Sequence, residues 1–120
     1  MNQWKSLFLT LIGIMAGALI SFPLFAATAS VPGNRSITSI TTYPGYAVIS
    51  YTPSFSNSLC SSSYTSNTVV LDWTTDSDFK ALLPAILAAK FLDKPVGFGI
   101  SSVCHPAFGG VPRVYRIDLP

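Results

Sequence analysis

The sequence predicts a small, mainly β domain with one α-helix, in the order strand, strand, strand, helix, strand, strand. Three observations support this prediction. Two segments rich in β-branched or alternating residues flank a Pro-Gly pair, residues 79–91 carry apolar side chains at helical spacing, and two further strand-like segments follow. Without its first 29 residues the chain has about 90 residues, the length of one domain. We find no internal repeat and no second domain.

The first two strands form a predicted β-hairpin. Residues 36–43 are rich in β-branched side chains and lead into Pro44 and Gly45, which favour a turn because proline presets φ and glycine tolerates positive φ. Residues 46–52 then alternate between two faces. The side chains expected together on one face are Ala47, Ile49 and Tyr51.

A long loop and a third strand come next. Serine dominates residues 53–67, which show no periodicity and therefore predict a loop. Residues 68–73 predict a strand that is apolar on both faces, so we expect it to be central or covered by the helix that follows.

The helix gives the clearest pattern in the chain. Asp76 or Ser77 is expected to cap its first turn. Pro84 cannot donate a backbone hydrogen bond, so it predicts either a kink or a short turn before the main helix begins. The helix should end by Lys94, because Pro95 disfavours helical geometry before it. The expected apolar stripe consists of Phe79, Leu82, Leu83, Ile86, Leu87 and Phe91.

Two strands complete the domain. Residues 95–101 alternate large apolar side chains with Gly97 and Gly99, which suits a strand that bends or is closely approached by another backbone. Residues 102–112 predict a loop, and residues 113–119 predict the last strand. We expect Tyr115, Ile117 and Leu119 on one face of that strand, and Val114, Arg116 and Asp118 on the other.

The N-terminus predicts export. A short polar start with one cation precedes an uncharged apolar stretch, and Ala27-Thr28-Ala29 fits the pattern that signal peptidase recognises. We therefore expect residues 1–29 to be a cleaved signal peptide and residues 30–120 to be the exported domain, in the periplasm or outside the cell. The alternative is an uncleaved anchor, because residues 7–29 lack charge and are long enough to span a bilayer. A cleaved signal would be the chain's only contact with a membrane.

Charge and motif content exclude several functions. The few cations are scattered, whereas nucleic-acid binding needs a clustered basic face. The sequence has no GxSxG, HExxH or P-loop motif, and all five acids are isolated aspartates. Asp72, beside Trp73, is interpreted as a strand-end residue facing solvent or the helix. We therefore predict a protein that is not an enzyme and has no cofactor.

The two cysteines predict a disulfide between Cys60 and Cys104. Cys104 precedes His105, the only histidine, but adjacent residues of an extended segment point to opposite sides, which argues against a catalytic pair. A zinc site would lack ligands, since one histidine and two cysteines leave it short. An oxidising compartment favours a disulfide, whose loop of about 45 residues would stabilise the fold by about 4 kcal/mol. His105 is then expected to be a loop residue that bonds to backbone.

The serine-rich loop is a candidate ligand-binding segment. Its mixture of serine, asparagine and tyrosine provides adaptable hydrogen bonding together with flat aromatic contact. An exposed, mobile loop without a ligand is the alternative interpretation. The candidate binding residues are Tyr51, Ser54, Ser56, Asn57, Ser61, Ser62, Ser63 and Tyr64.

The region from Trp73 to Ile100 resembles a known family. Together with the four residues before it, this region reads VVLDWTTDSDFKALLPAILAAKFLDKPVGFGI (residues 69–100). The segment is similar to the central part of the receptor-binding B subunits of subtilase cytotoxin and typhoid toxin. In that family one disulfide lies wholly before the helix, whereas here the cysteines flank it, and no sugar-binding residue is carried over. The matching residues are Trp73, Phe79, Lys80, Leu82, Leu83, Ala88 or Ala89, Phe91, Pro95 and Val96.

This resemblance implies a small OB-like five-stranded barrel that assembles into rings of five and binds sialylated cell-surface glycans. The predicted order of strands and helix is compatible with such a barrel. Our leading hypothesis is therefore a secreted, non-enzymatic recognition module. The alternative is a small periplasmic or surface protein, structural or inhibitory, that binds a protein partner through an exposed strand edge.

Overall fold

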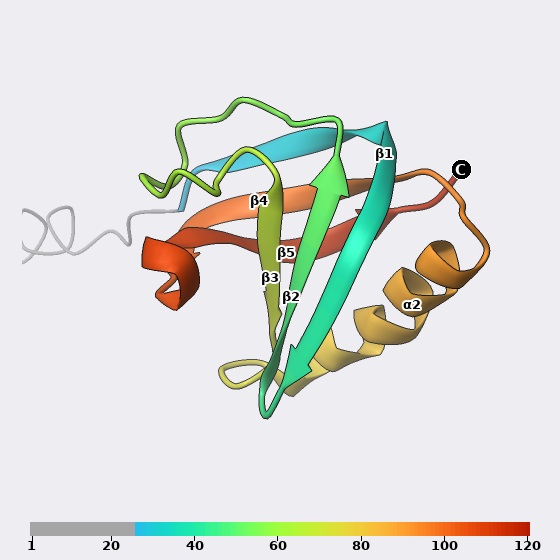
Figure 1. The fold of residues 1–120 in the computed structure, drawn as a ribbon. Helices are drawn as coiled ribbons and strands as arrows, with labels where there is room; N and C mark the ends of the chain where they lie inside the picture. Colours follow the sequence, from blue (N-terminus) through green and yellow to red (C-terminus); the bar gives the residue numbers. More distant parts are fainter. Residues whose placement is uncertain (1–25) are drawn as a thin grey trace, which may run out of the picture.

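The computed structural model describes residues 26–120, in which five strands form a closed barrel in the order β1-β2-β3-β5-β4 (Figure 1). One helical segment lies between β3 and β4. This OB-like arrangement and its order of elements confirm the prediction from the sequence. The strands are β1 (Thr28–Tyr43), β2 (Tyr46–Thr52), β3 (Thr68–Asp72), β4 (Val96–His105) and β5 (Val111–Asp118).

The first strand begins earlier than predicted. The expected signal segment lies mostly outside the described residues, but β1 already begins at Thr28. Thr28 pairs with Ser101, and Ala29 pairs with Ile100. Cleavage after Ala29 would therefore remove the first two residues of β1.

The hairpin between β1 and β2 forms as the Pro-Gly pair predicts. Tyr43 pairs with Tyr46, and Gly45 takes a φ of 89°, which favours glycine. The Gly45 carbonyl also accepts a hydrogen bond from the Trp73 amide at 3.0 Å. That bond ties the hairpin turn to the end of β3.

Two apolar clusters stabilise the barrel. The main core lies inside it and includes Ile49 and Tyr51 of β2, as their alternation predicts. A second cluster lies on the opposite side of the same strands: Val48, Val70 and Val111 are buried there, and Tyr46 packs against them. Because β3 contributes to both clusters, it is apolar on both faces.

The helical segment accommodates Pro84 by a short turn before the main helix, which is one of the two predicted alternatives. A 3-10 helix (η1, Ser77–Leu82) comes first, and the α-helix α2 (Leu83–Phe91) follows, so Pro84 stands in the first turn, where a missing amide costs no hydrogen bond. Asp76 caps η1 by accepting a hydrogen bond from the Asp78 amide at 3.0 Å. The expected stripe is wrong at Phe91, which is 84% exposed. The 3-10 turn before Leu83 changes the helical phase, so Ile86 and Ala89 are the buried residues of α2.

The end of β4 corrects the predicted loop. Residues 102–105 were expected to be irregular, but β4 continues to His105, which pairs with Val111 of β5. Within the same strand, a Cβ added at Gly97 would lie 2.7 Å from the Val31 carbonyl oxygen. The prediction that glycine allows close approach of another backbone is therefore confirmed at Gly97.

A bulge in β5 corrects the expected faces of the last strand. Gly99 pairs with Arg116 and Ile100 pairs with Val114, which leaves Tyr115 as an extra residue. The bulge interrupts the alternation of period two. Val114 is consequently buried in the core, and Ile117 packs against the same core rather than on the opposite face.

Candidate recognition surface

Two connections meet at one end of the barrel. The serine-rich loop (residues 53–67) joins β2 to β3, and the β4–β5 connection (residues 106–110) contains a 3-10 turn, η2 (Ala107–Gly109). Both lie at the opposite end of the molecule from α2 (Figure 1). The disulfide predicted from the sequence joins Cys60 of the loop to Cys104 near the end of β4, just before the β4–β5 connection, so the two connections are neighbours.

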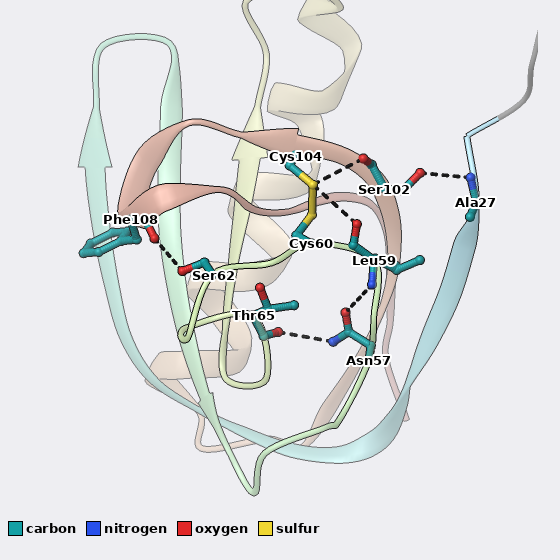
Figure 2. The surroundings of a disulfide bond; sticks show 9 residues. All are labelled: Ala27, Asn57, Leu59, Cys60, Ser62, Thr65, Ser102, Cys104 and Phe108. Atoms are coloured by element: carbon teal, nitrogen blue, oxygen red, sulfur yellow. Dashed lines mark hydrogen bonds between the residues drawn. A yellow bond between two sulfur atoms is a disulfide. The ribbon is translucent and has the colours of Figure 1, made fainter.

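Further contacts join the two connections beside the disulfide (Figure 2). The Ser62 hydroxyl donates a hydrogen bond to the Phe108 carbonyl and accepts one from the Tyr64 amide at 3.2 Å. Sγ of Cys104 also lies 3.5 Å from the Leu59 carbonyl oxygen. The Ser62 side chain thus bonds to the backbone of two aromatic residues, Tyr64 and Phe108, one from each connection.

The serine-rich loop is organised by its own hydrogen bonds. The Asn57 side chain donates to the Thr65 carbonyl at 3.2 Å and accepts from the Leu59 amide at 3.3 Å (Figure 2). It also donates to the Phe55 carbonyl at 3.2 Å. The Phe55 amide donates to the Ser66 carbonyl at 2.7 Å. These bonds join the two halves of the loop, which reduces the ordering cost of binding a ligand.

Two aromatic rings project from the joined connections. Tyr64 and Phe108 are each 50% exposed, and their ring centroids lie 5.4 Å apart at an interplanar angle of 59°. Phe108 has a φ of 55°, a left-handed conformation that is unusual for a bulky residue. Such a conformation costs about 1–3 kcal/mol and is typical of functional segments. The surface formed by Tyr64, Phe108 and residues 61–63 is called the aromatic surface below.

The structure divides the predicted binding residues into three groups. Ser61, Ser63 and Tyr64 are exposed on the aromatic surface, next to Phe108. Ser54 and Ser56 are exposed in the first half of the loop, outside that surface. Tyr51, Asn57 and Ser62 serve the fold.

Tyr51 was predicted to bind a ligand, but it lies in the barrel core rather than on the aromatic surface. It is only 2% exposed, and its ring packs 5.7 Å from that of Phe98 in the barrel core. Burial raises the pKa of Tyr51 to about 12, although the nearby Arg35 has a smaller opposite effect. Tyr51 is therefore a neutral core residue that a ligand on the outer surface does not reach.

A polar network lies at the base of the β4–β5 connection. His105 Nε2 lies 3.4 Å from Asp72 Oδ2, and Arg113 approaches the same oxygen at 2.9 Å. Thr74 donates to the other carboxylate oxygen from its amide and its hydroxyl. The His105 ring also packs against Tyr46, with centroids 4.5 Å apart.

This network corrects the interpretation of Asp72. The residue is 5% exposed and faces His105 and Arg113, because the ends of β3, β4 and β5 meet on the outside of the barrel. Burial opposes its ionisation, but the bonds from Thr74 and the positive charge of Arg113 outweigh burial and hold the pKa of Asp72 below its usual range. The carboxylate is thus ionised at neutral pH.

Both nitrogens of His105 have partners. Nδ1 accepts a hydrogen bond from the Ala107 amide at 3.1 Å, which fulfils the expectation that His105 bonds to backbone. His105 is, however, the last residue of a strand and is 8% exposed. A ring whose nitrogens face a backbone amide and a carboxylate has none directed at a serine or cysteine nucleophile. The arrangement is that of a structural network.

Sequence reasoning missed Phe108 and the partners of His105. Glycine at positions 109 and 110, directly after Phe108, was the available signal for a tight turn that exposes a ring. Within residues 26–120, no cluster of three or more His, Cys, Asp or Glu side chains is placed to hold a metal ion, and no helix is long and apolar enough to cross a membrane. Comparisons with protein-family models, curated proteins and solved structures found no match to this chain.

Proposed function

We propose that the protein is an exported, non-enzymatic recognition module that binds a glycan on the aromatic surface. One observation carries this proposal: two half-exposed rings from connections distant in sequence are held together by a disulfide and by Ser62. Exposed aromatic rings offer apolar faces to the C–H groups of a sugar, while flanking serine hydroxyls can exchange hydrogen bonds with its hydroxyls. The OB-like barrel supports the proposal, because such barrels commonly bind oligosaccharides.

The charge of the surface favours neutral sugars. Neither the serine-rich loop nor the β4–β5 connection contains a lysine, arginine, aspartate or glutamate. A sialylated glycan, which the toxin resemblance implies, carries a carboxylate that is usually bound by a cation or by several amide donors. We therefore expect neutral sugar residues to make the main contacts.

A glycan array with the oxidised protein tests this function. The array should include neutral oligosaccharides and their sialylated counterparts. We expect retention on neutral glycans, and a loss of at least about fivefold in affinity for both Tyr64→Ala and Phe108→Ala, since loss of a stacking contact costs about 1 kcal/mol or more.

The matched control is Tyr43→Ala. Tyr43 is also an exposed tyrosine, but it lies at the tip of the β1–β2 hairpin, at the other end of β2 from the serine-rich loop (Figure 1). The control variant should bind like the wild type. Equal losses in the control and in Tyr64→Ala, or no retention on any glycan, would count against the aromatic surface.

Self-association is a second candidate property, favoured by the opposite end of the molecule. A cavity of about 340 Å³ lies between α2 and the C-terminal residues Leu119 and Pro120. Phe91 and Leu92 at the end of α2, together with Leu119, are exposed. Exposed apolar side chains gathered in this way are typical of protein interfaces, and the toxin resemblance makes a second copy the first partner to test.

Light scattering of the oxidised protein separates self-association from a monomeric module. A Phe91→Ser, Leu92→Ser variant should reduce the particle mass if this patch joins copies into a ring. A wild-type protein that remains monomeric at high concentration would exclude the ring and leave the glycan proposal standing. The closed barrel gives less support to the predicted protein partner at a strand edge, since each strand is paired on both sides.

A further inference from the structure

We propose that His105 is a pH-sensitive positioning residue for the aromatic surface: its neutral ring holds the β4–β5 connection in place, and its protonation releases the segment that carries Phe108. The inference rests on the proposed function for its biological meaning. The positioning itself is a property of the fold that can be measured without a ligand.

The proton arrangement of the ring follows from its two partners. The Ala107 amide can only donate, so Nδ1 must accept and must carry no proton. Nε2 faces a carboxylate oxygen of Asp72, so it carries the proton of the neutral ring. The neutral Nε2–H form is the one state of His105 that satisfies both contacts.

Protonation of Nδ1 turns the bond to Ala107 into a conflict. Two N–H donors would then face each other across the present separation of 3.1 Å. The ring cannot readily turn away, because Nε2 is held towards Asp72 and the ring face rests on Tyr46. The Ala107 backbone is therefore the part that moves.

The β4–β5 connection is prepared to move. Phe108, Gly109 and Gly110 have φ values of 55°, 81° and 108°, so three successive residues are left-handed. The 3-10 turn η2 has only three residues. Its contacts are the Ala107 bond to His105, the Ser62 bond to the Phe108 carbonyl and its own bond from the Gly110 amide to the Ala107 carbonyl, and the disulfide-bonded Cys104 lies just before it. Loss of the Ala107 bond would allow the strained Phe108 backbone to relax and carry its ring away from Tyr64.

The charged groups around the ring set the direction of the switch. Burial lowers the pKa of His105, the negative Asp72 on β3 raises it, and the positive Arg113 on β5 lowers it, with a net lowering below the usual value. Tyr46 on β2 packs against the ring, with the two ring centroids 4.5 Å apart. Asp72 remains ionised there because its own pKa is also lowered. The connection is thus held at neutral pH and released in acid.

Amide hydrogen exchange of Ala107, followed by NMR from about pH 7.5 to about pH 4.5, tests the proposal, because this range brackets the usual titration of histidine. After correction for the intrinsic exchange rate, we expect the protection of Ala107 to fall by about tenfold, the loss of one hydrogen bond. The fall should follow the titration of the His105 ring protons, while the amide of Val70 in β3 remains protected.

The matched variant is His105→Asn. An asparagine Oδ1 can take the place of Nδ1 as the acceptor for Ala107, but it does not titrate in this range. Ala107 should therefore stay protected in acid in this variant. A wild-type Ala107 that keeps its protection while His105 titrates would overturn the proposal, as would the same pH dependence in His105→Asn. If the variant does not fold, the wild-type titration alone decides between these outcomes.

Glycan binding is measured separately over the same pH range. Release of Ala107 together with weaker glycan binding supports both the positioning role and the proposed function. Release of Ala107 without any change in binding supports the positioning role and removes Phe108 from the binding site. Unchanged protection with pH-dependent binding overturns the positioning role and leaves the proposed function intact.

Discussion

Removal of the disulfide should destabilise the protein by about 4 kcal/mol. Cys60 and Cys104 are 44 residues apart, and the chain-entropy treatment of a closed loop of that length gives this value at room temperature. A domain of this size typically has a stability of about 5–15 kcal/mol. Loss of the cross-link would therefore remove a large part of the total and leave the barrel close to its unfolding threshold.

Urea unfolding of the oxidised protein, followed by the fluorescence of the half-buried Trp73, measures this loss. The perturbation is the double variant Cys60→Ala, Cys104→Ala. Either single variant should lose about as much as the double variant, because one missing thiol already prevents the bond. Reduction of the wild type should reproduce the loss, whereas treatment of the double variant with reductant should have no effect.

The loop-closure argument has a clear point of failure. A double variant whose free energy of unfolding stays within about 1 kcal/mol of the wild type would refute it, since the constraint on the unfolded chain would then be minor. A loss far above about 5 kcal/mol would equally contradict it, because the folded state would then depend on direct contacts at the joined connections.

Two other predictions concern the hairpin and the polar network. Gly45→Ala should lower the free energy of unfolding in urea by about 1–3 kcal/mol, because Gly45 has a positive φ and an added Cβ would lie 2.5 Å from Thr74 Cγ2. An unchanged urea midpoint in this variant would contradict the prediction. The lowered pKa of His105 contributes stability that is fully present above the unfolded pKa of about 6.5. This stability is lost as the pH falls from there through the folded pKa. The lowered pKa of Asp72 causes a second loss of stability, below about pH 4. Asp72→Asn should remove the second loss in urea midpoints measured against pH, and an identical acid profile in that variant would place the sensitivity elsewhere.

The local features of the fold were predictable from the sequence. The Pro-Gly pair at residues 44 and 45 defines a turn by its own backbone preferences, and the alternation of β2 separates the two faces of a strand. Pro84 limits the α-helix to a start just before it, and two cysteines in a chain whose N-terminus predicts export have one simple pairing. Each of these predictions depends on neighbouring residues or on a covalent bond.

The remaining features depend on contacts between distant segments. β4 extends to His105 because β5 pairs with it there, and the bulge at Tyr115 arises from the register of the same two strands. No local pattern predicts that Asp72, His105 and Arg113 converge, since each comes from a different strand. The exposure of Phe108 likewise follows from the closure of the two connections by the disulfide.

The most direct test of the central claim is a map of the binding site. Backbone amide shifts of the oxidised protein would be followed by NMR during titration with the oligosaccharide retained most strongly on the array. The account predicts that the largest shifts occur at residues 61–64 and 107–110, with little change along α2. The largest shifts at the α2 end, or none at the aromatic surface at saturating oligosaccharide, would contradict it.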